Sequence, residues 1–419
     1  RTSRRQFLGG AAAASLALSM PAIAQGPARV VVIGGGFGGA SCARALHQLK
    51  LGLNVTLVES IKTFIACPFS NEVIADDRAM TAQQFGYDKV AASGVTIVFQ
   101  SAVKIDPQAR SIGLADGTTL TYDRLVLSPG IELRFDALPG YDEAASERIP
   151  HAWKAGAQTL LLKRQLESMD DGGVVAISVP ANPYRCPPGP YERASLIAHY
   201  LKAKKPRSKL LILDAKDAFS KQRLFQNAWQ ELCPGLIEWV GLSQGGKVNS
   251  VEPASNTLVT DFAQHKVHVA NVIAPQRAGR IAEIAGVADR SGWCPIDPVS
   301  FESKQVPNIH VIGDACIGGG MPKSAFTANA QAKACASAVV AMLAGEAPAV
   351  PKLINTCYSL VAPDYGISIA GVSQPKNGLL TDVEGAGGVS PLDAPREFRA
   401  READYARSWY QTITAEVFG

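Results

Sequence analysis

The chain has 419 residues, which is too long for one small hydrophobic core and indicates two or three domains. Its composition is ordinary for a globular protein, with 47% hydrophobic residues, 19% charged residues and a formal net charge of +4. This balance indicates neither a nucleic-acid-binding surface nor an acidic tail. After the N-terminal segment, no apolar run of the sequence is long enough to span a bilayer.

Residues 1–25 have the pattern of a targeting segment. Arg4 and Arg5 precede an apolar run over residues 8–20, and small residues follow at positions 22–24. This order is typical of a twin-arginine export signal, with the periplasm as destination. We therefore expect disulfides to persist in the mature protein, and we expect it to be exported already folded around a cofactor.

Residues 26–140 begin with a dinucleotide-binding fingerprint. The apolar strand 30–33 runs into a G-x-G-x-x-G motif made of Gly34, Gly36 and Gly39, and a helix is expected from residue 41. These glycines allow a tight turn, close approach of the main chain to a pyrophosphate, and packing of the helix on the strand. A second strand ends at Glu59, where a carboxylate would accept a hydrogen bond from a ribose hydroxyl.

The rest of this region fits the same kind of domain. A strand is predicted over residues 102–105, where the main chain near Val103 would meet the adenine edge, and a hairpin is predicted over residues 111–122. A buried strand over residues 124–128 then stops at Gly130. This succession resembles the first half of the flavoproteins with two dinucleotide-binding domains, so we interpret residues 26–140 as the first segment of an FAD-binding domain.

Cys67 lies on the loop that runs toward the flavin ring in such folds. An isolated cysteine is most often a small buried thiol, and by composition alone this is the favoured interpretation. The alternative is a thioether to the 8α-methyl carbon of the flavin.

Residues 141–265 repeat the nucleotide-binding pattern with one alteration. A strand at 173–179, a helix at 191–203 and a strand ending at Asp214 follow the expected order. The glycine loop is replaced by the segment 180–190, which is rich in proline. Because proline removes amide donors and blocks the compact turn, we predict that the scaffold is kept and the NAD site is lost. The alternative is a divergent but working NAD site.

The same loop carries Cys186 immediately before the predicted helix. A helix N-terminus lowers the pKa of a thiol, so we expect a reactive cysteine here. Glu192 lies in the first turn of the helix, where it would exchange protons with a bound sulfur species. The alternative is an acidic residue that is simply favoured by the helix dipole.

From residue 266 to residue 346 we expect the chain to complete the FAD domain. Strands are predicted at 271–275 and at 309–312, and the second ends at Gly313 and Asp314. In FAD folds of this type the aspartate accepts hydrogen bonds from the ribityl hydroxyls. A helix predicted over residues 321–343 would point its N-terminus at the flavin edge, where charge accumulates on reduction. Lys323 would add to this effect, or would be a solvated lysine.

Residues 347–419 are predicted to form a small α+β cap or interface domain. Strands are expected at 353–360, which contains Cys357, and at 365–369. A helix over residues 395–418 would place four apolar side chains on one face, namely Phe398, Tyr405, Trp409 and Ile413. The predicted fold class is therefore α/β, with two Rossmann-like nucleotide-binding domains, the FAD domain discontinuous, and a small α+β C-terminal domain.

The sequences around Cys67, Cys186 and Cys357 together resemble the flavoprotein subunit of flavocytochrome c sulfide dehydrogenases. The matching stretches are Thr-Phe-Ile-Ala-Cys-Pro-Phe-Ser-Asn, Arg-Cys-Pro-Pro-Gly-Pro-Tyr-Glu and Asn-Thr-Cys-Tyr-Ser. The resemblance implies a thioether from Cys67 to FAD and a redox-active disulfide between Cys186 and Cys357 beside the flavin. It also implies that Glu192 is the nearby acid or base and that Trp409 lies near the ring.

The resemblance further implies that hydrosulfide attacks the disulfide and that FAD passes the electrons to a c-type cytochrome subunit in a heterodimer. We expect Cys186 to take the sulfide and Cys357 to face the flavin. The chain has no Cys-x-x-Cys-His motif, so the haem must lie on the partner polypeptide. No metal site is predicted, and no role is assigned to Cys42, Cys233, Cys294, Cys316 and Cys335.

Three other functions remain open. A sulfide:quinone reductase has the same fold and similar sulfur chemistry, but it would need a membrane-docking surface that the C-terminal helix does not show. An NADH-dependent disulfide reductase is opposed by the 180–190 loop. A flavoprotein with a carrier or assembly role would use its disulfide only structurally.

Overall fold

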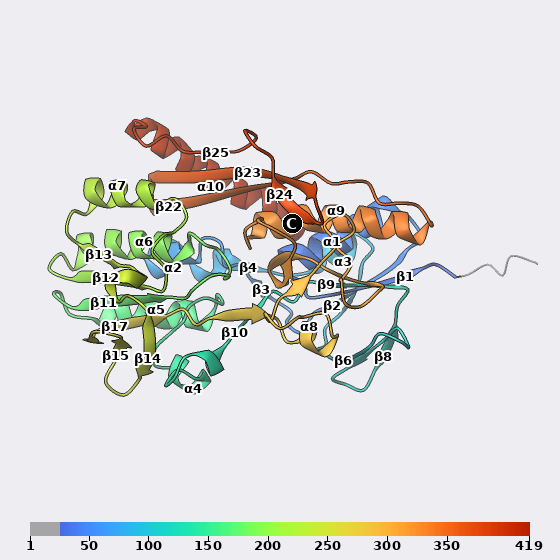
Figure 1. Cartoon of the computed structure of the whole chain (residues 1–419), viewed down its shortest axis with the longest axis horizontal. Coiled ribbons are helices and arrows are strands. Elements are labelled where there is room, and N and C mark those ends of the chain that lie inside the picture. The colour runs from blue at the N-terminus through green and yellow to red at the C-terminus, as the bar shows by residue number, and fades with distance from the viewer. Residues whose placement is uncertain (1–25) are drawn as a thin grey trace, which may run out of the picture.

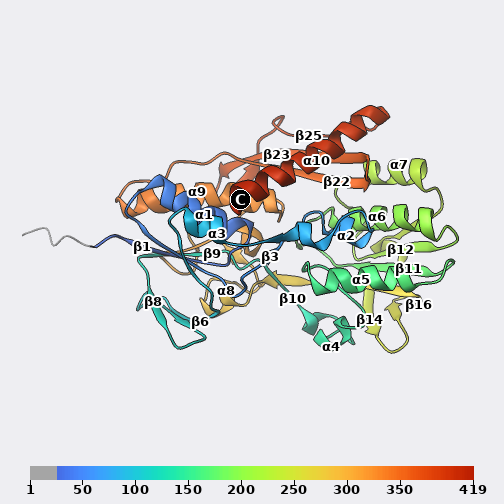
Figure 2. The same ribbon diagram turned by 180° about the vertical axis from the view of Figure 1, so that it is seen from behind.

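The computed structural model describes residues 26–419, so the export signal predicted for residues 1–25 lies outside the described residues. Two domains with parallel sheets lie side by side, and an antiparallel C-terminal sheet lies across both (Figure 1 and Figure 2). The predicted fold class is confirmed. Within residues 26–419, every helix is too short or too polar to cross a membrane.

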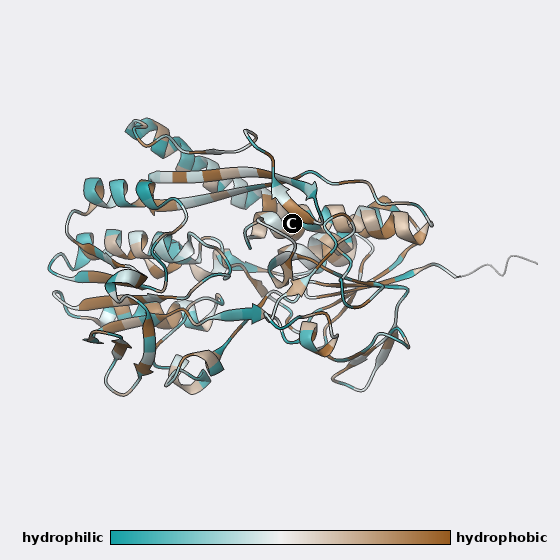
Figure 3. Ribbon diagram, viewed as in Figure 1, coloured by the Kyte–Doolittle hydropathy of each residue, from teal (hydrophilic) through white to brown (hydrophobic). Residues whose placement is uncertain are grey.

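The first domain is built on a parallel sheet whose order is β20-β9-β1-β2-β5. Its strands carry nearly continuous apolar runs, as expected for a parallel sheet covered on both faces, and Figure 3 shows them as brown segments inside the molecule. The helices α1 and α9 pack against each other in this domain. These elements are β1 (Arg29–Ile33), β2 (Asn54–Val58), β5 (Thr96–Val98), β9 (Arg124–Leu127), β20 (Ile309–Val311), α1 (Phe37–Leu49) and α9 (Ala325–Leu343).

The glycine turn after β1 is as tight as its sequence indicates. Gly34 has a φ of 98°, and a Cβ at this position would lie 2.3 Å from the carbonyl oxygen of Ser128. A Cβ on Gly39 would lie 1.7 Å from the carbonyl oxygen of Gly34, so only glycine lets α1 approach the turn this closely. The helix begins at Phe37, earlier than the predicted residue 41.

The second domain has a parallel sheet with the order β13-β12-β11-β17. Because β17 pairs with β11, the strand around Asn271 belongs to this sheet and not to the first domain, where we had placed it. The chain returns to the first domain only afterwards, through β18, which pairs antiparallel with β10. These elements are β10 (Ile131–Leu133), β11 (Val174–Val179), β12 (Lys209–Asp214), β13 (Ile237–Val240), β17 (Val269–Val272), β18 (Gln276–Ala278), α5 (Ala157–Ser168), α6 (Gly189–Lys204) and α7 (Gln222–Leu232).

The C-terminal sheet is formed by β22, β23, β24 and the short β25, and α10 packs on β22 and β23. The strand β22 also contacts α6 of the second domain and α9 of the first. This strand therefore lies over the junction between the two domains. The elements are β22 (Leu353–Ala362), β23 (Tyr365–Lys376), β24 (Leu379–Asp382), β25 (Gly388–Val389) and α10 (Arg396–Val417).

Two details of the predicted helices are wrong. Tyr405 is 55% exposed, and the buried face of α10 runs instead through Ala403, Ala406, Tyr410 and Ile413. The helix α9 starts at Ala325 and not at residue 321, because Ser324 caps it by accepting a hydrogen bond from the Thr327 amide at 3.0 Å.

The remaining elements form short connections and two small meanders, β6-β7-β8 and β14-β15-β16, the first of which contains the predicted hairpin. They are β3 (Phe64–Ile65), β4 (Gln84–Phe85), β6 (Ala102–Asp106), β7 (Ser111–Leu114), β8 (Thr119–Thr121), β14 (Val248–Glu252), β15 (Thr257–Thr260), β16 (Gln264–Lys266), β19 (Cys294–Pro295), β21 (Cys316–Ile317), α2 (Ser70–Ile74), α3 (Asp88–Ala92), α4 (Glu143–Ser146) and α8 (Ile281–Ile284).

Candidate active site

A cavity of about 710 Å³ is lined by residues of both parallel-sheet domains and of the C-terminal domain, and we call it the main cavity. Most of the residues predicted to bind a cofactor or to react lie on its wall: Gly34, Gly36, Glu59, Cys67, Gly130, Cys186, Glu192, Gly313, Asp314, Cys357 and Trp409. Three predicted residues do not line it: Gly39, Val103 and Lys323. Gly39 lies beneath the glycine turn, and Val103 is 51% exposed on β6, next to Ala102, which does line the cavity.

The glycine turn and Glu59 form one end of the main cavity. One Glu59 carboxylate oxygen accepts from the Gly35 amide at 2.6 Å, and the other accepts from the Ile61 amide at 3.0 Å. The carboxylate is therefore fixed beside the turn at the N-terminus of α1. This arrangement of amides, helix terminus and acid fits the ADP half of a dinucleotide.

Asp314 gives a test of whether FAD fits further along the same cavity. Its Oδ1 is buried and has no hydrogen-bond partner among residues 26–419, while its Oδ2 lies 4.0 Å from Arg185. Burial raises the pKa of this carboxyl, and Arg185 and Lys323 oppose the rise. A buried acceptor that lacks a donor fits the hydroxyl groups of a ribityl chain.

Lys323, which we expected to add to the effect of the α9 N-terminus or to be solvated, does not line the main cavity. Because α9 begins only at Ala325, Lys323 belongs to the preceding segment, and its ammonium donates to the carbonyl oxygens of Asp314 and Cys316, both at 2.8 Å. It also lies 4.0 Å from the centre of the Trp293 ring. The side chain faces a second cavity, described below.

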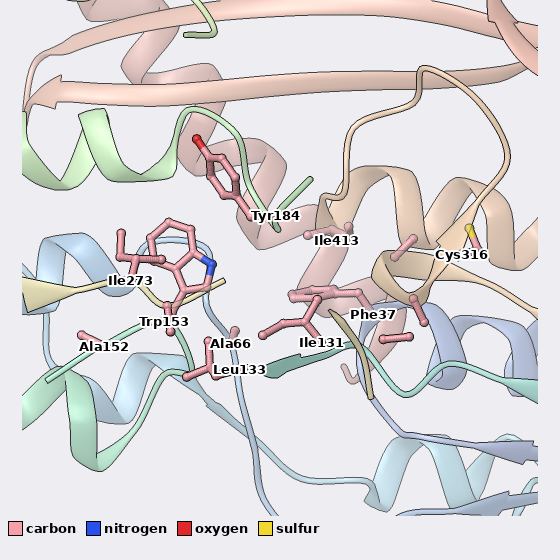
Figure 4. Close-up of a cluster of buried hydrophobic side chains, with 14 of the residues drawn as sticks. Phe37, Ala66, Ile131, Leu133, Ala152, Trp153, Tyr184, Ile273, Cys316 and Ile413 are labelled. Carbon is pink, nitrogen blue, oxygen red and sulfur yellow. The ribbon is translucent and has the colours of Figure 1, made fainter. Parts of the chain in front are cut away.

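Cys67 lies on the loop before α2, with its sulfur 3.7 Å from the carbonyl oxygen of Trp153. The Trp153 side chain stands between the domains, with Tyr184 on one side and Ile131 and Phe37 toward the first domain (Figure 4). The Cys67 side chain is partly exposed on the cavity wall, which leaves its sulfur open to a bound group.

Cys186 also lines the main cavity, in a loop with a left-handed backbone at this residue. Its φ is +57°, its amide donates to the carbonyl oxygen of Lys323 at 2.8 Å, and its carbonyl oxygen accepts from the Gly189 amide at 2.8 Å. We expected the helix N-terminus to lower the pKa of the thiol, and this was wrong. Burial raises the pKa strongly, and Glu192 and Cys357 raise it further.

Cys357 reaches the cavity from β22. Alternate residues of this strand face the domain junction, which places Asn355, Cys357 and Ser359 on one side. The Asn355 amide donates to the Cys357 sulfur at 3.3 Å, and its own oxygen is held by Ser324 at 2.7 Å. The sulfur therefore has an oriented donor beside it. Cys186 and Cys357 are both free thiols here, so the predicted disulfide stays a prediction.

Glu192 and Lys221 form a buried pair of charges near the two thiols. Burial raises the pKa of Glu192 to about 7, while the Leu360 amide, which donates to this carboxylate at 3.3 Å, opposes the rise. The Lys221 ammonium donates to the Cys357 carbonyl oxygen and to the Ser359 hydroxyl, both at 2.8 Å. Burial lowers the pKa of Lys221 to about 8.

Sequence reasoning missed Lys221, and it also missed Arg193, whose guanidinium is buried without a carboxylate partner. Arg193 donates to Asn71, His151, Ala152 and Asn271, whose acceptor atoms are all uncharged. Burial lowers its pKa to about 10, so the group stays charged at neutral pH. It therefore supplies positive charge to the cavity wall, where an anion would be stabilised.

The second domain has lost the acceptor that a nicotinamide dinucleotide would need. The Asp214 carboxylate accepts from Tyr191 at 2.5 Å, Trp239 at 3.0 Å and Lys216 at 2.6 Å, and it is fully buried. No oxygen of this carboxylate remains open to a ribose. The prolines of the 180–190 loop and the occupied Asp214 carboxylate both oppose binding of a nicotinamide dinucleotide.

Trp409 lines the main cavity in an aromatic group that sequence reasoning missed. Its ring stacks on Phe326, with centroids 6.0 Å apart, and lies 6.1 Å from Tyr358. The three rings come from α10, α9 and β22 and cover the cavity on the side of the C-terminal domain. The five cysteines without an assigned role are buried: Cys42, Cys233, Cys294, Cys316 and Cys335.

Three family models match different regions of the chain. Residues 28–166 match "Pyridine nucleotide-disulphide oxidoreductase", and residues 159–274 match "Sulfide dehydrogenase (flavocytochrome c) flavoprotein chain, central". Residues 349–418 match "Flavocytochrome c sulphide dehydrogenase, flavin-binding". These regions include the glycine turn, Cys186 and Cys357.

Two curated relatives are informative. The mitochondrial sulfide:quinone oxidoreductase of Mus musculus is 23% identical over 323 residues, which is 72% of this chain and 68% of the relative. The flavoprotein chain of a flavocytochrome c sulfide dehydrogenase from Chlorobaculum thiosulfatiphilum is 58% identical over 48 residues, which is 12% of this chain and 100% of the relative.

Solved structures show the same fold. The sulfide:quinone oxidoreductase of Aquifex aeolicus has a TM-score of 0.74 and 17% identity, with 93% of this chain and 92% of the other covered. Putidaredoxin reductase, in its covalent complex with putidaredoxin, has a TM-score of 0.66 and 16% identity, with 94% of each covered. The chain therefore has the fold of these reductases, and its sequence is similar in separate regions to pyridine nucleotide-disulphide oxidoreductases and to sulfide dehydrogenase flavoprotein chains.

The raised pKa of Glu192 predicts a pH dependence of stability. Between its ordinary value of 4.5 and about 7, the folded protein binds more protons at this site than the unfolded chain, so stability falls as the pH rises through this range. Glu192→Gln should remove this pH-dependent loss of stability. The difference in free energy of unfolding, variant minus native, should be about 2 kcal/mol larger at pH 8 than at pH 5. Thermal unfolding midpoints at both pH values measure this difference. Glu346→Gln, at an exposed site, is the control, and an equal effect of Glu192→Gln at both pH values would contradict the assignment.

Proposed function

We propose that the protein is the flavoprotein of a periplasmic sulfide dehydrogenase. It oxidises hydrosulfide to sulfur or polysulfide through a Cys186–Cys357 disulfide and FAD, and it passes the electrons to a c-type cytochrome subunit. One observation carries the proposal: Cys67, Cys186 and Cys357, which come from three domains, line one cavity. The two flavocytochrome c family matches, which contain Cys186 and Cys357, support it.

The surroundings of the two sulfurs favour one direction of attack on the proposed disulfide. Hydrosulfide would bond to the Cys186 sulfur and break the Cys186–Cys357 bond, which leaves a persulfide on Cys186 and a thiolate on Cys357. Cys357 is the better leaving group because the Asn355 amide donates to its sulfur. Cys186 is the poorer one because burial and Glu192 oppose a negative charge there.

Glu192 is suited to handle the proton of this step. A carboxyl with a pKa of about 7 can both accept and return a proton near neutral pH. Lys221, bonded to the Cys357 carbonyl oxygen, keeps a positive charge next to the proposed thiolate. Raising the pH past about 8 would remove this charge.

FAD, when bound, supplies the acceptance of an electron pair and its release as single electrons. The chain would hold it through the glycine turn, Glu59 and Asp314, with Cys67 as the site of the thioether. Arg193 contributes a charged group to the same cavity. With haem on a separate subunit, single electrons would leave toward that partner.

Substitution of either thiol tests the proposed disulfide. Cys186→Ser and Cys357→Ser should each slow flavin bleaching by sulfide by about 1,000-fold or more, because no exchange step remains. Bleaching by dithionite, which needs no disulfide, should be unchanged. Cys233→Ser, at a buried thiol outside the main cavity, is the matched control. Turnover that survives Cys357→Ser would instead indicate a structural role for the pair.

The thioether is tested by intact mass after acid denaturation. The native chain should retain the mass of FAD, and Cys67→Ala should lose it while still binding FAD before denaturation. An apoprotein mass for the native chain removes the covalent link. This outcome would leave the sulfur chemistry at Cys186 and Cys357 unaffected.

A quinone acceptor is the second candidate, because the similarity to sulfide:quinone oxidoreductases extends over most of the chain. The purified flavoprotein should pass electrons from sulfide to its c-type cytochrome at least about 100-fold faster than to a soluble quinone. Parallel assays of cytochrome and quinone reduction, with the same sulfide concentration, measure the ratio. Faster reduction of quinone than of cytochrome would indicate that quinone is the electron acceptor.

A further inference from the structure

A second cavity, of about 490 Å³, lies behind the loop that carries Cys186. Residues of this loop are divided between the two cavities: Arg185 and Cys186 line the main cavity, and Tyr184 and Pro187 line the second. Gly313 lines both. The two cavities therefore adjoin each other at the Cys186 loop and at Gly313.

The second cavity occupies the cleft in which a dinucleotide-binding domain would hold its nucleotide, but it has lost the groups for one. The loop residues Asn182, Pro183 and Pro187 form one wall, and the two prolines have no amide to donate. The Asp214 carboxylate at the end of β12 is already saturated by its own neighbours. A dinucleotide would therefore lack the proline-free amide loop and the open carboxylate acceptor that such a domain offers.

The groups that remain suit a small soft anion. Lys216 and Lys323 line the cavity, and none of its lining residues is an aspartate or glutamate. Asp214 pairs with Lys216 from outside the lining at 2.6 Å, and Lys323 bonds only to carbonyl oxygens. Apolar and polarisable groups cover much of the rest: Phe219, Met321, Pro322 and Leu380.

We propose that this cavity is the entry site for hydrosulfide, which is collected beside Lys216 and Lys323 and reaches Cys186 past Pro187. The inference rests on the proposed function. It is supported by the position of the cavity, since bound FAD would occupy the main cavity. The backbone of Cys186 touches the wall directly, through its hydrogen bond to the carbonyl oxygen of Lys323 at 2.8 Å.

Ala218 provides the test, because it is exposed and lines the second cavity but not the main one. Sodium hydrosulfide is mixed rapidly with the FAD-loaded protein, and the second-order rate constant of flavin bleaching is measured. Ala218→Trp should lower it at least about tenfold by filling the entrance. Bleaching by dithionite should not change, and Ala144→Trp, at an exposed site of α4, should behave as the native protein.

Two variants of opposite charge at Ala218 distinguish an electrostatic effect from a steric one. Ala218→Asp should slow bleaching by sulfide about threefold, Ala218→Lys should speed it, and the difference should shrink at high salt. Native rate constants in Ala218→Trp, or equal rate constants for the Asp and Lys variants at low salt, would overturn the inference while leaving the proposed function intact. Failure of the proposed function looks different, because sulfide would then not bleach the native protein.

Discussion

A buried ammonium group holds the two sides of the sulfur site together. Lys221 is the N-cap residue of α7 in the second domain, and its side chain donates hydrogen bonds to Cys357 and Ser359 on β22 of the C-terminal sheet. Burying an ammonium is costly, so its acceptors must be present and well placed. The opposed charge of Glu192 lies near it, and this carboxylate in turn accepts from the Leu360 amide of the same strand. The position of β22 relative to α6, and so of Cys357 relative to Cys186, depends on these contacts.

The same contacts make the two thiols chemically unequal. Burial and Glu192 raise the pKa of the half-buried Cys186 thiol, whereas Cys357 has an amide donor at its sulfur and an ammonium group on its carbonyl oxygen. A symmetric pair of thiols would give no preferred direction to thiol–disulfide exchange. The asymmetry arises from the two domains that meet there and not from either cysteine alone.

Local sequence predicted the features of the site that are built locally. The glycine turn, Glu59 and the Gly313-Asp314 strand end follow from short-range patterns, and the structure places all of them on one cavity. The groups that tune the sulfurs were not predictable in this way. Lys221 meets Cys357 across 136 positions of sequence, and Glu192 meets Leu360 across 168, so no periodicity or spacing signals either contact. The errors at Lys323 and Cys186 have different physical origins: α9 starts later than predicted, and burial raises the pKa of the Cys186 thiol.

The altered loop of the second domain connects these observations. A loop with amide donors at 180–190 would bind a nucleotide next to the flavin, and a nicotinamide there would compete with sulfur chemistry for the same electrons. Prolines in the loop prevent this, and the loop instead presents Cys186 to the main cavity. Tyr191 stacks on Phe219, and its hydroxyl donates to the Asp214 carboxylate. This hydrogen bond uses the acceptor that a ribose hydroxyl would need. The same loop thus both removes amide donors from the second cavity and places Cys186 on the main one.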